Sequence, residues 1–397
     1  MKVLMISDTV EFSGAEEATL NHASLLSKQE DVDVQLCSTR FRDSKVQRLP
    51  FERSLYIDEQ KPKRIEELYR SLAHPRNLLR MLSHCQNVAR DFHPDVVHSG
   101  IFLSVVPSLV IARRLKVPVV AHLHDYRILS LTDLPFLSGS VFVQSYMSEL
   151  ANYLQTEKPY QALLGLGFRR SILAFYNRCD HIIAVSNFAR NSVSNLLRPP
   201  VSVLYNAGYN FARSETRKKK SDQPTVLYCG RLSVAKGFPI FLDAAEILLQ
   251  EMDVEIHIAG GGDLDTLALR FVRKHGEKKA FFHGFLWDAK FHDLVAQSHL
   301  TVHPSLSPEP CPLSVIKSVN LGTTAIASNR GGLRELLPSK YLFEPTPAEI
   351  RNKILQFFDR PQDFPPSLSP DLKGDSITRQ LLSVYEEVAR SRFQSLS

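Results

Sequence analysis

Short apolar runs rich in β-branched residues alternate along this chain with longer stretches of helical spacing, such as residues 15–28. In the first half the apolar runs predict strands near residues 3–7, 32–38, 95–99, 117–122, 181–186 and 201–205. An alternation of strands and helices is typical of parallel sheets whose strands are joined by crossover helices. We therefore predict an α/β fold built on parallel sheets.

A second alternation of the same kind begins after residues 209–223, which are charged, turn-rich and without an apolar period. Its strands are predicted near residues 225–229, 254–259, 280–283, 300–303 and 324–328. Its helices are predicted from Lys236, near 264–274, near 288–297 and after Pro312. Because the pattern starts afresh, the second half is expected to form a sheet of its own.

The two alternations indicate two domains, since 397 residues are long for a single hydrophobic core. We predict a doubly wound first domain over residues 1–208, a linker over 209–223 and a doubly wound second domain over 224–375. A last helix, over 376–397, is expected to pack back on the first domain. Doubly wound sheets bind ligands beyond the carboxyl ends of their strands, so a cleft facing both sets of strand ends is expected.

The composition, with 44% apolar and 23% charged residues, is that of a globular protein. The net charge of +6 is spread over both halves, so nucleic acid is not an expected partner. The apolar start, broken by Asp8 and Glu11, predicts a buried strand and not a signal peptide, and the apolar-rich segment 101–112 is too short to span a bilayer. Five scattered cysteines without a CxxC spacing fit buried thiols in a reducing cytoplasm, where we expect this protein.

The segment over residues 303–335 carries the clearest candidate chemistry. A predicted strand ends there in a loop with Glu309, and Pro312 and Gly322 mark the start and the end of a short helix. The Glu309 carboxylate is thus placed beside a helix N-terminus, where free N–H groups and the helix dipole favour an anion. A carboxylate for hydroxyl groups and a dipole for phosphate together indicate a sugar-nucleotide site.

Three more strand ends of the second half carry candidate ligand contacts. Gly230 and Arg231, followed by Lys236, come directly after the first strand, where two cations suit a diphosphate, although alone they are more often solvated. The glycine triplet that starts at Gly260 allows close approach to a ligand or serves only a tight turn. Phe285 would lie either against a nucleotide base or in the core.

In the first half, Gly14 lies in a loop of small residues between the first strand and its helix, which suits approach to a phosphate or a sugar. His122, His124 and Asp125 follow a predicted strand. The HxHD pattern resembles a metal site, but no third distant ligand is apparent, so zinc is disfavoured. A polar contact to a sugar is the better use of His124, and His122 is expected to be structural.

Residues 61–90 hold seven lysine or arginine residues against two glutamates, interleaved with leucines. A basic amphipathic helix can lie on an anionic membrane surface, which would place the protein at the inner face of the membrane. More often such a helix turns its apolar face to the core and its cationic face to solvent. Both interpretations stay open.

These motifs, in this order and spacing, resemble those of the retaining glycosyltransferases of family 4, which have the GT-B fold. The resemblance is strongest over residues 225–336, and in the first half it rests on SGAEEATLNHASLL, HPDVVHS, AHLHDY, IIAVSNFAR and VLYNAGYN. It implies two doubly wound Rossmann-like domains facing a central cleft. It also implies transfer of a sugar from a nucleotide sugar to a glycan, lipid-linked or other glycoconjugate acceptor, with retention at the anomeric carbon.

The resemblance implies roles for five residues of the second half. Arg231 and Lys236 would hold the donor diphosphate and stabilise it as it departs. Glu309 would hydrogen-bond hydroxyl groups of the transferred sugar, assisted by backbone amides near Leu313 and Ser314. Such enzymes need neither a protein nucleophile nor a bound metal, so no metal or other cofactor is expected.

Five further positions complete the predicted site. His124 would contact the sugar from the first domain, and Gly14 would let the acceptor or a phosphate come close. Gly230, Gly260 and Phe285 belong to the predicted donor-binding set.

Lys317 departs from the family pattern, which has a second glutamate eight residues after the first to accept hydrogen bonds from the nucleotide ribose. A lysine offers three donors and no acceptor. Losing one charge-assisted hydrogen bond would cost about 1.5–3 kcal/mol. Three outcomes stay open: altered nucleotide recognition, a lysine turned towards phosphate, or a binding or regulatory protein that has lost catalysis.

Two other enzyme classes use doubly wound domains. A nicotinamide-dependent dehydrogenase is disfavoured, because neither half opens with GxGxxG followed by an acidic residue about twenty positions later. A nucleotide-sugar epimerase would bind the same donor and remains an alternative.

Overall fold

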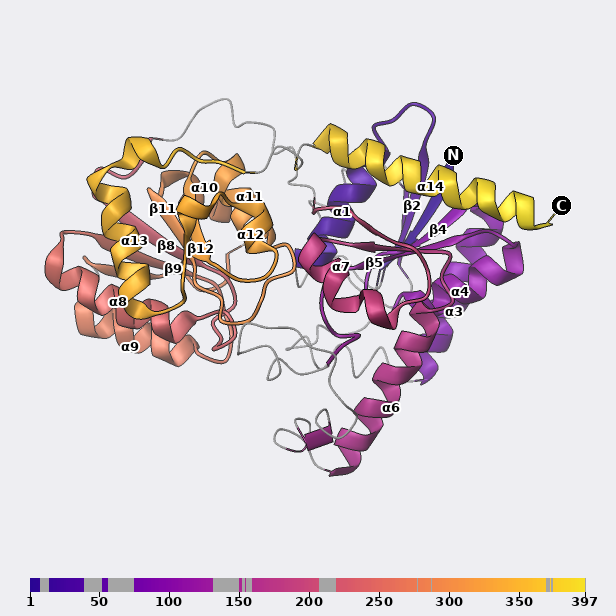
Figure 1. The fold of residues 1–397 in the computed structure, drawn as a ribbon, viewed down its shortest axis with the longest axis horizontal. Helices are drawn as coiled ribbons and strands as arrows, with labels where there is room; N and C mark the ends of the chain where they lie inside the picture. Colours follow the sequence, from indigo (N-terminus) through magenta and orange to yellow (C-terminus); the bar gives the residue numbers. More distant parts are fainter. Residues whose placement is uncertain are drawn as a thin grey trace. The chain divides into compact units, whose positions relative to one another are not determined.

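The computed structural model of the chain describes residues 1–7, 14–38, 52–55, 75–130, 150–151, 154, 159–206, 219–276, 278–286, 288–368, 372 and 374–396. The chain divides into two compact units. Of the described residues, the first unit contains those up to 206 and those from 372 onward, and the second contains 219–368. Figure 1 shows an α/β arrangement in each unit.

The first unit is built on a parallel sheet with the strand order β3-β2-β1-β4-β5-β6-β7. Its strands are β1 (Lys2–Ile6), β2 (Asp33–Ser38), β3 (Glu52–Leu55), β4 (Val96–Ser99), β5 (Val119–Leu123), β6 (His181–Ala184) and β7 (Val201–Val203). The six strands predicted for this half are confirmed, with ends that differ by at most two residues. β3 was not predicted, because its sequence ERSL holds a single apolar residue.

The helices of the first unit are α1 (Gly14–Leu26), α3 (Pro75–Phe92), α4 (Val105–Leu115), α6 (Pro159–Tyr176), α7 (Asn187–Val193) and α14 (Gly374–Leu396), with a short 3-10 turn at Ser194–Leu196. Ser186 caps the N-terminus of α7, because its Oγ accepts a hydrogen bond from the backbone N–H of Ala189 at 3.1 Å. Such a cap satisfies a helix N–H that would otherwise lack a partner.

The last helix, α14, completes the core of the first unit. Ile377, Leu381 and Tyr385 are at most 1% exposed and pack in one cluster with Val3 and Met5 of β1. α14 also packs against α1, beside which it lies in Figure 1. The chain thus returns from the second unit to finish the first.

α3 covers the described part of the basic stretch predicted over residues 61–90; residues 61–74 lie outside the described residues. Met81, Cys85 and Ala89 recur every four positions and are buried, so this stripe of α3 faces the core. Leu79 is 64% exposed. Within the described ranges we find no helix whose length and apolar character would let it span a bilayer.

The second unit has a parallel sheet with the order β10-β9-β8-β11-β12-β13. Its strands are β8 (Thr225–Cys229), β9 (Glu255–Ala259), β10 (Ala280–Phe282), β11 (Leu300–His303), β12 (Thr324–Ser328) and β13 (Leu342–Phe343). All five strands predicted for this half are confirmed. β13 has only two residues, which is too short to give a periodicity.

The helices of the second unit are α8 (Phe238–Glu251), α9 (Asp265–His275), α10 (Asp288–Gln297), α11 (Leu313–Asn320), α12 (Leu333–Leu336) and α13 (Pro347–Asp359), with 3-10 turns at Ser339–Tyr341 and Pro361–Asp363. The prediction of a helix from Lys236 was wrong by two residues. Gly237 has φ +68°, and a Cβ there would lie 1.8 Å from Pro304 O. The chain can pass this close to β11 only as glycine in a left-handed turn, so Lys236 precedes the helix.

The predicted linker over 209–223 falls largely outside the described residues, but its end is packed on the second unit. Lys220 Nζ donates to Ser298 O at 2.6 Å and to Thr323 Oγ1 at 2.7 Å. Burial lowers the pKa of Lys220 to about 8. Lys220 is therefore packed on the second unit, although it lies within the predicted linker. All five cysteines are buried and free of disulfides, as predicted.

Candidate active site

A pocket opens at the carboxyl ends of β8 and β11, two neighbouring strands at the centre of the second sheet. This edge is where doubly wound sheets bind ligands. The residues that line the pocket include Gly230, Lys236, His303, Ser305, Glu309 and Ser314. The fold therefore brings four predicted site residues, from two separate stretches of sequence, to one place.

A partly buried ion pair forms the polar centre of this pocket. Lys236 Nζ donates to both carboxylate oxygens of Glu309, at 2.6 Å to Oε1 and 2.7 Å to Oε2. Ser305 Oγ donates to Oε1 at 2.6 Å. The Glu309 side chain is 10% exposed and that of Lys236 is 30% exposed. The ammonium group is therefore the more accessible partner of the pair.

The charge of Glu309 depends on these partners. Burial alone would raise the pKa of Glu309, but the Lys236 ammonium, its hydrogen bonds and the Ser305 hydroxyl together lower it. Arg231 lowers the pKa of Glu309 further through its charge. Glu309 is thus ionised at neutral pH and acts only as a hydrogen-bond acceptor.

The ion pair leaves spare hydrogen-bonding capacity in the pocket. An ammonium has three N–H donors, and contacts with the described residues use two of those on Lys236. A carboxylate has about four acceptor positions; Lys236 and Ser305 use three of those on Glu309. The remaining donor suits a phosphate oxygen, and the remaining acceptor suits a hydroxyl group.

A glycine turn supports the loop that carries Glu309. Gly332 N donates to Glu309 O at 2.6 Å. Gly331 has φ +57°, and a Cβ there would lie 2.6 Å from the same carbonyl oxygen. At Gly332 a Cβ would lie 2.0 Å from Pro310 O. The two glycines therefore let the chain after β12 approach and fix the Glu309 backbone.

The glycine triplet after β9 has a structural role. Gly260 has φ +152°, and a Cβ there would lie 1.8 Å from Gly230 O. Gly230 N in turn donates to Ala259 O at 3.1 Å. Gly260 is not among the described residues that line the pocket. Packing of β9 against the turn after β8 is enough to require this glycine, which favours the tight-turn interpretation.

Three other predicted residues are not among the described residues that line the pocket. Arg231 is exposed, and its carbonyl accepts a hydrogen bond from Tyr228 Oη at 2.8 Å. Phe285 is 59% exposed, so the interpretation as a core aromatic is wrong. Leu313 is buried as the first residue of α11.

Lys317 lies on α11, three residues after Ser314, with its Nζ 5.5 Å from the ring centre of Phe291 on α10. Burial, helped by the nearby Lys317 charge, lowers the pKa of His292 to about 4. Burial raises the pKa of Cys229 to about 12, and Lys317 counteracts part of this rise. Because Cys229 lines the pocket, the Lys317 charge acts on a residue of the pocket wall.

His303 and Ser305 also line the pocket but were not predicted as site residues. His303 is the last residue of β11 and Ser305 lies two residues beyond it, so their place at a central strand end was the available signal. Ser305 precedes Glu309 by four residues and bonds its carboxylate, a contact that helical or strand periodicity does not predict.

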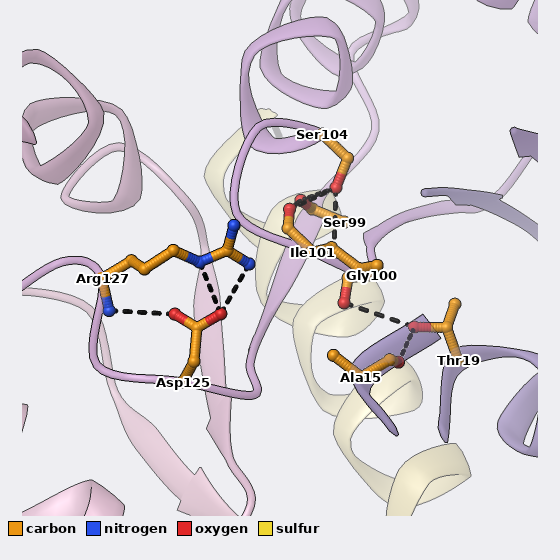
Figure 2. A network of polar contacts seen from close by, with 8 residues as sticks. All are labelled: Ala15, Thr19, Ser99, Gly100, Ile101, Ser104, Asp125 and Arg127. Atoms are coloured by element: carbon orange, nitrogen blue, oxygen red, sulfur yellow. Dashed lines mark hydrogen bonds and ion pairs between the residues drawn. The ribbon is translucent and has the colours of Figure 1, made fainter. Parts of the chain in front are cut away.

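The carboxyl edge of the first sheet carries a second polar network (Figure 2). Thr19 Oγ1 of α1 lies 3.0 Å from Ala15 O and 3.3 Å from Gly100 O, just beyond β4. Beyond β5, Asp125 pairs with Arg127, whose Nε donates to Oδ2 at 2.7 Å. Gly14 was predicted in a loop, but it is the first residue of α1 and is exposed. Residues 8–13 lie outside the described residues.

Four buried histidines gather behind this edge: His22 of α1, His98 of β4, His122 of β5 and His124 just after it. The rings of His122 and His124 stack at 4.2 Å between centroids, and those of His22 and His122 at 5.1 Å. Burial lowers all four pKa values, to about 4 for His124 and about 3 for His98. The four rings are therefore neutral at pH 7.

The histidines do not converge on a metal ion. In the part of the chain that the structure describes, no group of three or more His, Cys, Asp or Glu side chains is arranged to hold one. His124 is 8% exposed, so only a small part of its ring is open to a ligand.

Comparison with known families decides the relationship of this chain. Residues 12–207 match the family described as Glycosyltransferase Family 4, and residues 211–367 match the one described as Glycosyl transferases group 1. The chain belongs to the family 4 glycosyltransferases. Both units of this family 4 member are covered, in the order that the sequence motifs predict.

Individual relatives agree with this membership. An uncharacterized glycosyltransferase of Methanocaldococcus jannaschii is 27% identical over 42% of this chain and 46% of its own length. A glycogen synthase of Mycobacterium tuberculosis is 26% identical over 62% of this chain and 55% of its own length. The family 4 member thus spans about half the length of these curated relatives.

Solved structures share the fold. Anabaena HepE in complex with UDP and glucose superposes with a TM-score of 0.70 at 17% identity, covering 97% of this chain and 99% of that one. Sucrose-phosphate synthase from Thermosynechococcus elongatus gives 0.65 at 15% identity, covering 100% of this chain and 98% of its own. The predicted GT-B fold class, with two doubly wound units, is confirmed.

Proposed function

We propose that this protein transfers a sugar from a nucleotide-sugar donor to a glycan, lipid-linked or other glycoconjugate acceptor, with retention at the anomeric carbon. The observation that carries the proposal is the partly buried Lys236–Glu309 pair at the carboxyl ends of β8 and β11. Its spare donor fits a phosphate oxygen and its spare acceptor fits a sugar hydroxyl. A nucleotide sugar carries both groups side by side.

In the proposed reaction the bond between the anomeric carbon and the diphosphate oxygen breaks, and the acceptor oxygen forms the new bond. Negative charge develops on the departing diphosphate, where Lys236 and the exposed Arg231 supply positive charge. Glu309 orients the sugar through a hydroxyl group. The fixed cations make a bound metal unnecessary for this charge stabilisation.

The comparisons favour uridine nucleotides as the first donors to test. HepE has been solved with UDP and glucose and also with UDP-glucose. A further structure with this fold, Trehalose-6-phosphate from Escherichia coli, has UDP-2-fluoro glucose bound. These relatives share only the fold with this chain, so they guide the choice of ligands and nothing more.

The test is a thermal-shift titration with UDP-, GDP-, ADP- and TDP-sugars, each with and without EDTA. We expect one nucleotide sugar to stabilise the protein equally in both conditions and to lose that effect in Arg231→Ala. Hydrolysis or transfer assays with that donor then report the stereochemistry of the product. Stabilisation that EDTA removes, or an inverted product, would contradict the metal-free retaining reaction.

A non-catalytic binding protein is the second candidate, and Lys317 favours it. It follows Ser314, a residue of the pocket lining, by three positions on α11, and it offers donors but no acceptor for hydroxyl groups. We expect Lys317→Glu to tighten binding of the nucleotide sugar about tenfold or more, the value of a charge-assisted hydrogen bond. Isothermal titration compares it with Lys317→Gln, which removes the cation without adding a carboxylate.

The two candidates give different results in this comparison. An active wild type that binds its donor, and is improved by Lys317→Glu, supports an enzyme with altered nucleotide recognition. A wild type that binds no donor, with binding recovered only in Lys317→Glu, supports a protein that keeps the fold but has lost catalysis. Weaker binding in Lys317→Glu than in Lys317→Gln would show that the lysine faces phosphate.

We further propose that the protein acts in the cytoplasm at a membrane surface. This proposal rests on the basic stretch over residues 61–90 and on the exposed Leu79 of α3. Vesicles with anionic lipids are expected to retain the wild type more strongly than a variant with Arg70, Arg76 and Arg80 changed to glutamine. Equal retention of both proteins would remove this proposal without touching the catalytic one.

A further inference from the structure

Thr301, His303 and Ser314 form a row of polar side chains that reaches the pocket. His303 Nε2 lies 3.2 Å from Thr301 Oγ1, and His303 Nδ1 lies 3.3 Å from Ser314 Oγ. Thr301 is completely buried and His303 is 6% exposed, whereas Ser314 is half-buried. His303 and Ser314 both line the pocket. This row of side chains therefore runs from the buried Thr301 on β11 to the Ser314 hydroxyl group at the pocket.

The hydrogen bonds between these three side chains have a preferred direction. Thr301 Oγ1 also lies 3.4 Å from Thr324 O, and a carbonyl oxygen can only accept, so the Thr301 proton points there. Thr301 then accepts from His303, which needs its single proton on Nε2. Burial lowers the pKa of His303 to about 3, so the ring is neutral and Nδ1 is an acceptor. Ser314 consequently gives its proton to Nδ1.

We propose that Ser314 Oγ serves in this pocket as an acceptor that recognises a hydroxyl group of the ligand, with His303 as its positioning residue. With its proton held by His303, the serine oxygen presents lone pairs to the pocket. This inference rests on the proposed function and extends it: Ser314 supplies a neutral acceptor one turn before Lys317, which has none. The hydroxyl belongs either to the ribose or to the transferred sugar.

The first test needs no ligand. Long-range ¹⁵N–¹H NMR spectra of the free protein report which ring nitrogen of His303 carries the proton, with assignment by a His303→Gln variant. We expect the proton on Nε2 and a bare Nδ1. A proton on Nδ1 would overturn the proposal, because Ser314 would then accept from His303 and turn its own proton to the pocket, as suits phosphate.

The second test identifies the hydroxyl. Binding of UDP-glucose, its 2′- and 3′-deoxyuridine analogues, and analogues deoxygenated at single sugar carbons is measured for wild type, Ser314→Ala and Ser314→Thr. Ser314→Ala should weaken binding of UDP-glucose about fivefold to tenfold, the value of one neutral hydrogen bond. One analogue should bind wild type and Ser314→Ala equally, and the hydroxyl group that it lacks is the one that Ser314 recognises. Ser314→Thr keeps a hydroxyl and should restore the difference.

Ser318→Ala is the matched control. Ser318 lies in the same helix, is buried, and donates to Ser314 O at 2.8 Å, but it is not among the described residues of the pocket lining. An equal loss for every analogue in Ser314→Ala, or a similar loss in Ser318→Ala, would overturn the proposal. If the wild type binds no nucleotide sugar of the full panel, the proposed function fails, whereas the NMR result decides the polarity of Ser314 separately.

Discussion

Lys236→Met is expected to reduce sugar transfer about 10²–10³-fold, as removal of one preorganised charge-stabilising donor does in other enzymes. The same change should destabilise the second unit by about 3–5 kcal/mol, because it leaves a buried carboxylate without its ion-pair partner. Glu309 would keep only the Ser305 hydrogen bond at 2.6 Å and the longer-range charge of Arg231. Urea unfolding and a transfer assay measure the two effects.

A second substitution separates stability from chemistry. In Lys236→Met/Glu309→Gln no charge is buried, so most of the lost stability should return while transfer stays low. Lys219→Met is the matched control, since Lys219 pairs with Asp222 at a surface where both side chains are over 80% exposed. It should change stability by less than about 1 kcal/mol. Transfer within threefold of wild type in Lys236→Met would show that the pair is structural only.

The ion pair shows what sequence reasoning could and could not reach. Glu309 was predicted from its place between a strand and a helix start, and Lys236 from its place after β8. Their direct contact could not be predicted, because 73 residues separate them and each pattern is local. The contact depends on Gly237, which lets the turn before α8 pass against Pro304.

The contacts that the C-terminal helix makes were even harder to predict from a sequence pattern. Helical spacing predicted a helix at the end of the chain, and α14 has that place. Tyr385 Oη meets His98 Nδ1 at 2.7 Å across 287 residues, and no periodicity links these two positions. The four-histidine cluster was likewise invisible, because three of its rings come from different elements and only HLH in the sequence hinted at it.

Acidification is expected to destabilise the first unit through these buried histidines. An unfolded histidine has a pKa near 6.5, whereas burial holds His124 at about 4 and His98 at about 3. A lowered pKa in a base means that the fold prefers the neutral ring. The stabilisation is therefore complete above about pH 6.5 and is lost as the pH falls towards the folded-state values. At pH 5 each of these two rings should cost roughly 2 kcal/mol.

His122→Phe tests this origin of the acid sensitivity. Neither ring nitrogen of His122 has a hydrogen-bond partner among the residues that the structure describes, and the ring is held by stacking on His22 and His124. Phenylalanine keeps the aromatic stack and removes one proton-binding site. Urea midpoints at pH 7.5, 6 and 5 should therefore fall less steeply for the variant than for wild type. Parallel slopes would place the acid sensitivity elsewhere, for example at Glu309, whose lowered pKa makes its ion pair weaken in acid as well.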